Sequence, residues 1–184
     1  MNIPYVGPVI SLSNSTVADK AGPVTEIYID ADACPVKEEV LRVAEQHQLK
    51  VHIVSNTWFR RGDGPLVNKV VVPEEPDAAD DWIAERIQRD DICVTGDIPL
   101  AGRCLGQGAA ALGHTGKPFT EDSIGMALAM RDLKSHLHNT GDIKDYTPSF
   151  TKADRLRFIS ALEDAVRKQK ARSYLNNRKH NHER

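Results

Sequence analysis

Two hydrophobic periods alternate along the middle of the chain. Short runs of apolar and β-branched residues, typical of buried strands, lie at residues 25–30, 50–56, 68–73, 91–95 and 109–112. Between and after them, helical spacing of apolar residues and helix-start signals predict helices at residues 35–47, 76–90, 98–108 and 120–138, and from Thr151 onward. Strands that alternate with helices indicate βαβ units, so we predict an α/β fold with a mainly parallel sheet.

Local signals mark several of the helix starts. Pro35 suits the first turn of the helix at 35–47, where Asp32 or Cys34 can provide the cap. Asp77 lies near the expected cap of the helix at 76–90. Thr151 and Asp154, three residues apart, resemble a capping box and predict the start of the last helix.

The length of 184 residues fits one domain with a substantial core. We place this domain at residues 25–171, between a flexible N-terminal tail at 1–24 and a polar, basic C-terminal tail at 172–184. No run of about 18 apolar residues predicts a membrane span, and the first residues do not resemble a signal peptide. Three cysteines without paired spacing indicate reduced thiols and a cytoplasmic protein.

Aspartates occur where the predicted strands end. Asp30 ends the first strand, Asp97 follows the strand at 91–95, and Asp80 lies in the first turn of the helix at 76–90. Parallel strands bring such residues to one edge of the sheet, where α/β proteins bind their ligands. Two carboxylates about 5 Å apart repel by roughly 3 kcal/mol at an effective dielectric near 20.

Such a cluster needs a cation, a shared proton or a basic partner. A site made of carboxylate oxygens favours Mg²⁺ or Mn²⁺ over zinc. Asp32 follows Asp30 on the loop, and Asp77 shares one face of the helix with Asp80. We expect Asp81 to face solvent, because it lies about 100° round the helix from Asp80.

Candidate partners for a phosphate group lie close to the same strand ends. Lys37 lies in the first predicted helix, and Asn56 and Arg60 follow the second strand. Trp58 beside Arg60 and Arg61 can stack a nucleobase while a guanidinium pairs with phosphate, although an exposed loop with one anchoring aromatic explains the same residues. A net charge of −2 gives no global reason to expect a polyanionic partner.

The sequence gives little support for a cysteine nucleophile, a histidine metal site or a nucleotide-binding loop. Cys34 at a helix start is better explained as a small buried cap residue than as a nucleophile, because no histidine stands in a partner position. The seven histidines show no ligand spacing, and the sequence contains no phosphate-binding loop motif for a nucleotide cofactor.

Several segments together resemble a known family. The segments IYIDADACPVKEEV, DAADDWI, DICVTGDIPLA, GAAAL and FTEDSIGMALAMRDL, with Asn56, are similar to the YaiI/YqxD family of uncharacterised bacterial proteins over about residues 25–165. That family in turn resembles PIN-like nucleases, which implies a sheet of order 3-2-1-4-5 and a Mg²⁺ or Mn²⁺ site at the strand ends. The resemblance matches Asp30, Asp80 and Asp97 to the metal-binding carboxylates, and it implies that Asp32 and Asp77 are auxiliary. Residues 113–116, GHTG, depart from the Asn-Pro-Arg-Gly turn of relatives, so an arginine that could contact phosphate is missing there.

Three functions are consistent with these residues. The first is a metal-dependent nuclease acting on RNA or single-stranded nucleic acid, with the metal activating water and neutralising charge. The second is a phosphatase of the haloacid dehalogenase type, with Asp30 as nucleophile and Asp32 as general acid. The third is a non-catalytic module that binds a cation or nucleic acid. Oligomeric state does not follow from the sequence.

Overall fold

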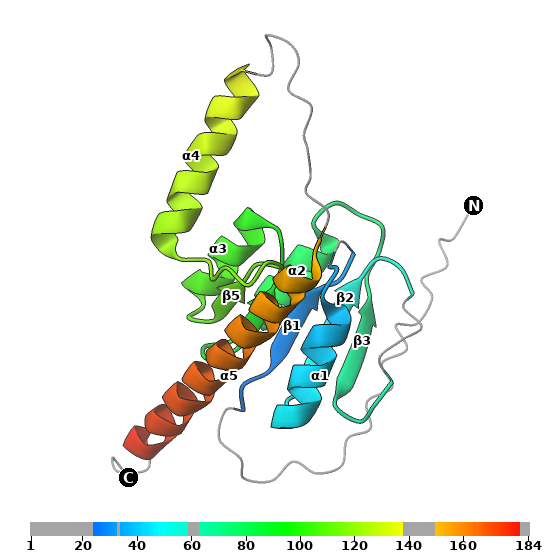
Figure 1. Ribbon diagram of the computed structural model, residues 1–184, viewed down its shortest axis with the longest axis vertical. Helices are drawn as coiled ribbons and strands as arrows, with labels where there is room; N and C mark the ends of the chain where they lie inside the picture. Colours follow the sequence, from blue (N-terminus) through cyan, green and yellow to red (C-terminus); the bar gives the residue numbers. More distant parts are fainter. Residues whose placement is uncertain (1–23, 33, 59–62, 138–149, 181–184) are drawn as a thin grey trace, which may run out of the picture.

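The structure, a computed structural model, describes residues 24–32, 34–58, 63–137 and 150–180. Its centre is a five-stranded sheet of order β3-β2-β1-β4-β5 (Figure 1). Every neighbouring pair of strands is parallel. The strands are β1 (Ile27–Asp30), β2 (Val51–Ser55), β3 (Val67–Val71), β4 (Ile92–Val94) and β5 (Ala110–Leu112). The predicted fold class and strand order 3-2-1-4-5 are confirmed.

Helices form at each of the five predicted places. They are α1 (Lys37–His47), α2 (Ala78–Arg86), α3 (Ile98–Gly106), α4 (Glu121–Leu137) and α5 (Lys152–His180). Because α5 continues to His180, the domain boundary predicted after residue 171 falls inside a helix. Ser173 is buried, and Asn176 donates a hydrogen bond of 3.1 Å to Asp90. The N-terminal tail predicted at 1–24 lies outside the described residues, apart from Val24.

Alternation along each strand divides the core into two halves. Ile27 and Ile29 of β1 pack on one face of the sheet, where α1 and α5 cover them. Tyr28 lies on the opposite face with α2 and α3, which makes three layers (Figure 1). Phe158 of α5 is fully buried in the first half of the core. Asp30 has the parity of Tyr28, so its side chain belongs to the α2 and α3 side of the sheet.

α4 has a different environment from the other helices. It reaches α3 through Ile124, whose side chain packs near Gly102. Figure 1 shows α4 pointing away from the sheet. Met126 and Met130 are exposed to solvent. Within the described part of the chain, no helix combines the length and the apolar character needed to cross a membrane.

The helix starts are capped in different ways. Thr151 and Asp154 form the predicted capping box, because Asp154 N donates to Thr151 Oγ1 and Thr151 N donates to Asp154 Oδ2. Asp97 caps α3 by accepting a 2.8 Å hydrogen bond from Leu100 N. The prediction that Asp32 or Cys34 caps α1 is wrong, since Val36 is the N-cap residue and makes no side-chain cap bond.

Candidate functional site

The carboxyl ends of the central strands hold the predicted aspartates. Asp30 ends β1, and Asp97 follows β4 as the cap of α3. Thr95, fully buried between them, donates from Oγ1 to Asp30 Oδ2 at 2.9 Å. The same hydroxyl oxygen accepts from Asp97 N at 2.9 Å. One side chain therefore fixes the two aspartates relative to each other, and strand alternation explains why it faces Asp30.

Asp32 is tied to the neighbouring strand. Its Oδ1 accepts a 2.5 Å hydrogen bond from Ser55 Oγ at the end of β2. Both of its carboxylate oxygens also accept from Asn56 N, at 3.1 and 3.2 Å. These bonds explain why Asp32 does not cap α1, and they hold the turn after β2 against the loop after β1.

A pocket of about 260 Å³ opens beside these residues. The segment between β3 and the first turn of α2 forms much of its wall. Four of the five predicted carboxylates line it, together with Asn56 and Glu75. The complete lining is Asp30, Asp32, Asn56, Val72, Pro73, Glu75, Pro76, Asp77, Ala78, Ala79 and Asp80.

Asp77 has an unusual backbone at the pocket wall. It is the N-cap residue of α2, with φ of 61° in the left-handed region, and its side chain makes no cap hydrogen bond. Aspartate and asparagine adopt this conformation more readily than most residues. The Asp77 carboxylate is therefore not used for capping, and it faces the pocket with Asp80.

Mutual repulsion of these carboxylates shows in their acidity. The pKa of Asp80 is raised from 3.8 to about 6, first by burial and then by the charges of Asp97, Asp30 and Asp77. Burial also raises the pKa of Asp30; the Thr95 hydrogen bond opposes this rise, whereas the charges of Asp32 and Asp97 add to it. The charges of Asp30, Asp80 and Asp97, from three separate elements, thus act on one another, although Asp97 does not line the pocket.

The chemistry of this donor set fits a hard divalent cation. Its members offer carboxylate oxygens, and their negative charges raise the pKa of Asp80 beyond the effect of burial. In the side-chain positions of the structure, however, the described residues contain no group of three or more His, Cys, Asp or Glu arranged to hold a metal ion.

Of the residues predicted to contact phosphate, Asn56 lines the pocket. Lys37 begins α1 and is partly buried. Arg60 lies outside the described residues. Two further basic residues near the site have other surroundings. Arg103 forms an ion pair of 2.8 Å with Asp81, which faces solvent as predicted, and Lys117 is exposed.

His114 is a neighbour of the site that the sequence did not indicate. A Cβ atom built on Gly96 would lie 3.2 Å from His114 Cε1, so this imidazole packs against the VTGD turn. Its Nε2 is shielded from solvent without a hydrogen-bond partner among the described residues. Burial lowers the pKa of His114, and the charge of Asp30 opposes that shift. No sequence spacing could reveal His114, because it lies in an irregular loop after β5.

Cys34 is buried as the sequence predicted, although it does not cap α1. Burial raises the pKa of its thiol to about 11. Since a thiolate is the reactive form, a neutral buried thiol is a poor nucleophile. Glu75, Thr95 and Ser55 are the other site residues missed by the sequence analysis.

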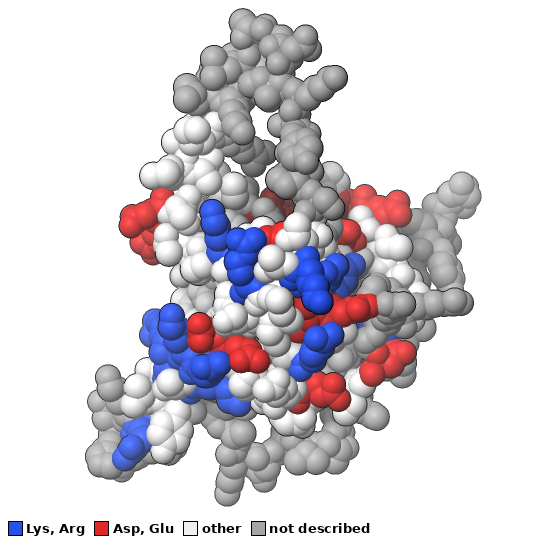
Figure 2. All heavy atoms as spheres, viewed as in Figure 1, with Lys and Arg blue, Asp and Glu red and all other residues white. Residues whose placement is uncertain are grey.

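Lys and Arg side chains cover part of α5. Figure 2 shows them over its C-terminal half, and shows further Lys and Arg side chains higher on the same face, interspersed with Asp and Glu. Lys170 donates to His47 O at the end of α1, and Arg172 pairs with Asp90 just before β4. These contacts place that half of α5 at the amino ends of the strands, on the opposite edge from the aspartates.

Comparison with known proteins gives a consistent family assignment. The model of the uncharacterized YaiI/YqxD family matches residues 28–168. A UPF0178 protein of Parvibaculum lavamentivorans is 64% identical over 143 residues, which are 78% of this chain and 94% of that protein. A UPF0178 protein of Rhodospirillum rubrum is 56% identical over 142 residues, 77% of this chain and 95% of that protein. No solved structure matches the chain significantly.

Proposed function

The chain belongs to the uncharacterized YaiI/YqxD family, and on that premise we propose that it is a divalent-metal-dependent nuclease acting on RNA or single-stranded nucleic acid. The observation that carries the proposal is the pocket at the carboxyl ends of the strands, which four of the five predicted aspartates line. Burial, and then the charges of Asp97, Asp30 and Asp77, raise the pKa of Asp80 in its wall. Nuclease sites commonly concentrate negative charge in this way to bind cations. The strand order and strand-end carboxylates are also those expected of PIN-like nucleases, which supports the proposal by resemblance alone.

In this proposal Asp30, Asp80 and Asp97 hold Mg²⁺ or Mn²⁺, with Asp32 and Asp77 in support. The bound cation supplies Lewis acidity and stabilises the charge that develops on the phosphate. Thr95 holds Asp30 and Asp97 in register through its two hydrogen bonds. Asn56 at the pocket wall and Lys37 at the start of α1 contact the substrate phosphate.

The alternatives use the same residues differently. A haloacid-dehalogenase-type phosphatase needs Asp32 as a mobile general acid, yet Asp32 accepts hydrogen bonds from Ser55 and Asn56 on both oxygens. This observation favours the nuclease. A non-catalytic cation- or nucleic-acid-binding module would keep the carboxylates and differ in the absence of cleavage.

The test compares wild type with Asp30→Asn and Asp80→Asn, using Mn²⁺ binding by calorimetry and cleavage of short RNA and single-stranded DNA. Asp81→Asn is the matched control, because Asp81 neighbours Asp80 on α2 but is exposed and paired with Arg103. We expect each of the two site variants to lose at least roughly tenfold in Mn²⁺ affinity, together with cleavage. Asp81→Asn should retain both.

Cleavage that persists in Asp30→Asn, or in excess chelator, would overturn the metal-dependent mechanism. Mn²⁺ binding that depends on Asp30 and Asp80 without any cleavage would instead establish the non-catalytic module.

A further inference from the structure

Trp58 is a large aromatic residue that lies mostly in solvent and not in the core. Its residue surface is 69% exposed, although a buried tryptophan removes more apolar surface from water than almost any other side chain. Trp82 shows the contrast, because it is partly buried beside His52 and Tyr28, with Arg86 over its ring. An indole left in solvent contributes little to the core, so its stacking face is available to a ligand.

The loop that carries Trp58 is anchored to the candidate site. Thr57 N donates to Ser55 Oγ at 3.1 Å, and Thr57 Oγ1 donates to Asn56 Oδ1 at 2.8 Å. Asn56 N is held in turn by Asp32. Asn56 lines the acidic pocket, and Trp58 follows two residues later, within about 7 Å of chain. The backbone thus leads from the pocket wall to the indole through a fixed turn.

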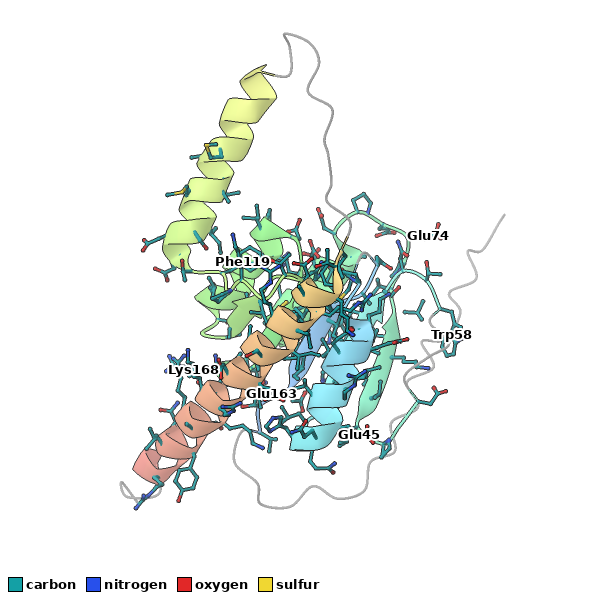
Figure 3. The ribbon with its side chains drawn as sticks, viewed as in Figure 1. Glu45, Trp58, Glu74, Phe119, Glu163 and Lys168 are labelled. Carbon is teal, nitrogen blue, oxygen red and sulfur yellow. The ribbon has the colours of Figure 1, made fainter. Side chains whose placement is uncertain are left out.

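One cation already lies over the ring. Lys69 Nζ of β3 lies 5.6 Å from the Trp58 ring centroid and pairs with Asp63 at 2.5 Å. Figure 3 shows Trp58 at the margin of the molecule, on the loop beside β3 and away from the packed core. The lysine restrains the indole, while the high exposure leaves most of the ring open to solvent.

We propose that Trp58 is a stacking platform for an unpaired nucleobase, next to the pocket that receives the phosphodiester. This inference rests on the proposed nuclease function and narrows its substrate class to single strands. Bases of a duplex stack on one another and are not free to stack on a side chain, whereas bases of a single strand are. Stacking needs no particular hydrogen-bonding edge, so binding through Trp58 selects for an unpaired strand rather than for a sequence.

The experiment measures binding without catalysis. Labelled oligonucleotides of about 12 nucleotides are titrated in chelator, as single strands, as a duplex, and as an abasic strand that has the same sugar-phosphate chain. Fluorescence anisotropy gives the affinity, and tryptophan emission reports stacking. The variants are Trp58→Ala, Trp58→Phe and, as the matched control for emission, Trp82→Phe, each checked for its melting temperature.

We expect Trp58→Ala to weaken single-strand binding by about tenfold and Trp58→Phe to keep most of the affinity. Emission should be quenched by single strands in wild type and Trp82→Phe but not in Trp58→Ala. Wild type should lose about tenfold on the abasic strand, whereas Trp58→Ala should bind both strands equally. Because the effect of removing the base then depends on the presence of the Trp58 ring, the comparison measures stacking itself and not a loss of charge or of folding.

Equal single-strand affinity of wild type and Trp58→Ala, or equal affinity of wild type for abasic and normal strands, would overturn the inference. So would preferential binding of the duplex, or no binding of single strands. Because chelator is present throughout, binding that depends on Trp58 stands even if no cleavage is ever found. Cleavage that depends on Asp30 but not on Trp58 would remove this inference and leave the nuclease.

Discussion

At the scale of single residues, the aspartates of the site differ in their hydrogen bonds and in their pKa values, although they look alike in the sequence. Asp32 and Asp97 are tied into the backbone, through Asn56 N and Leu100 N respectively. The pKa of Asp80 is raised to about 6, first by burial and then by the charges of its neighbours. Its protonation is therefore a sensitive reporter of the environment in the site.

Asp80→Asn is expected to stabilise the metal-free protein at about pH 8 and not at about pH 4. The pKa of Asp80 is raised from 3.8 to about 6, so the folded state holds its proton more tightly than the unfolded state. Stability linked to this group is therefore fully present below the unfolded pKa and lost as the pH rises through about 6. Asparagine cannot ionise, so the substitution restores the lost stability at about pH 8 and has no such effect at about pH 4.

The measurement is thermal unfolding in chelator at both pH values, with Asp81→Asn as the control. Asp81 is exposed and paired with Arg103, so its variant should show no such pH-dependent gain. An equal change in melting temperature at both pH values would contradict the assigned cause.

At the scale of elements, α5 is attached to the rest of the fold at a very close contact. Gly116, in the loop after β5, has φ of 83°. A Cβ atom there would lie 2.9 Å from Arg157 O and 3.1 Å from Phe158 Cα. Glycine is therefore required at this position for two reasons, the positive φ and the close approach of α5. The departure at residues 113–116 from the turn expected in relatives keeps this glycine.

Gly116→Ala should lower the free energy of unfolding by about 1 kcal/mol or more, because the new methyl group meets the backbone of α5 and the positive φ is strained. Gly106→Ala, at the end of α3, is the matched control. Its Cβ would meet nothing within 4 Å, so it should leave stability unchanged or raise it by about 0.5 kcal/mol. Urea unfolding of the two variants measures both effects, and an equal loss in both would refute the steric argument.

At the scale of the whole molecule, one face of the sheet depends on α1 and α5 together. Phe158 is 0% exposed and packs with the strands in the same half of the core as Val40 and Val43 of α1. Without α5, the last helix of the described chain, this face of the sheet would be exposed to water.

Phe158→Ala should cost about 3–5 kcal/mol, since it removes a fully buried aromatic ring and leaves a cavity. Leu156→Ala, two residues earlier on the same helix and 60% exposed, should change stability by no more than about 0.5 kcal/mol. Chemical denaturation distinguishes them. Similar losses in both variants would contradict the assignment of Phe158 to the core and of Leu156 to the exposed face of α5.

Much of this architecture could be predicted, for identifiable reasons. The buried runs around Ile29, Ile53 and Val94 are bounded by polar residues, so periodicity locates the strands, and parallel pairing then places Asp30 and Asp97 at one edge. The bonds of Asp32 to Ser55 and the approach of His114 to Gly96 depend on side-chain positions between elements distant in sequence. No local pattern encodes these contacts.

The end of α5 could not be predicted for a related reason. Its last turns are polar and read as a tail, but Ser173 is buried and Asn176 reaches Asp90. Tertiary contacts with the loop before β4 extend the helix where composition alone predicts fraying.

The order in which the layers appear has a consequence for synthesis. β1 is the centre of the sheet and among the first described residues to leave the ribosome, yet α5, which covers one of its faces, is the last helix to emerge. At a translation speed of about 5–20 residues per second, the apolar side chains of β1 remain without that cover for on the order of ten seconds. Throughout that interval Ile27 and Ile29 of the nascent chain form an exposed apolar surface that can aggregate. A chaperone that shields this strand during translation would therefore serve folding more than one that acts after release.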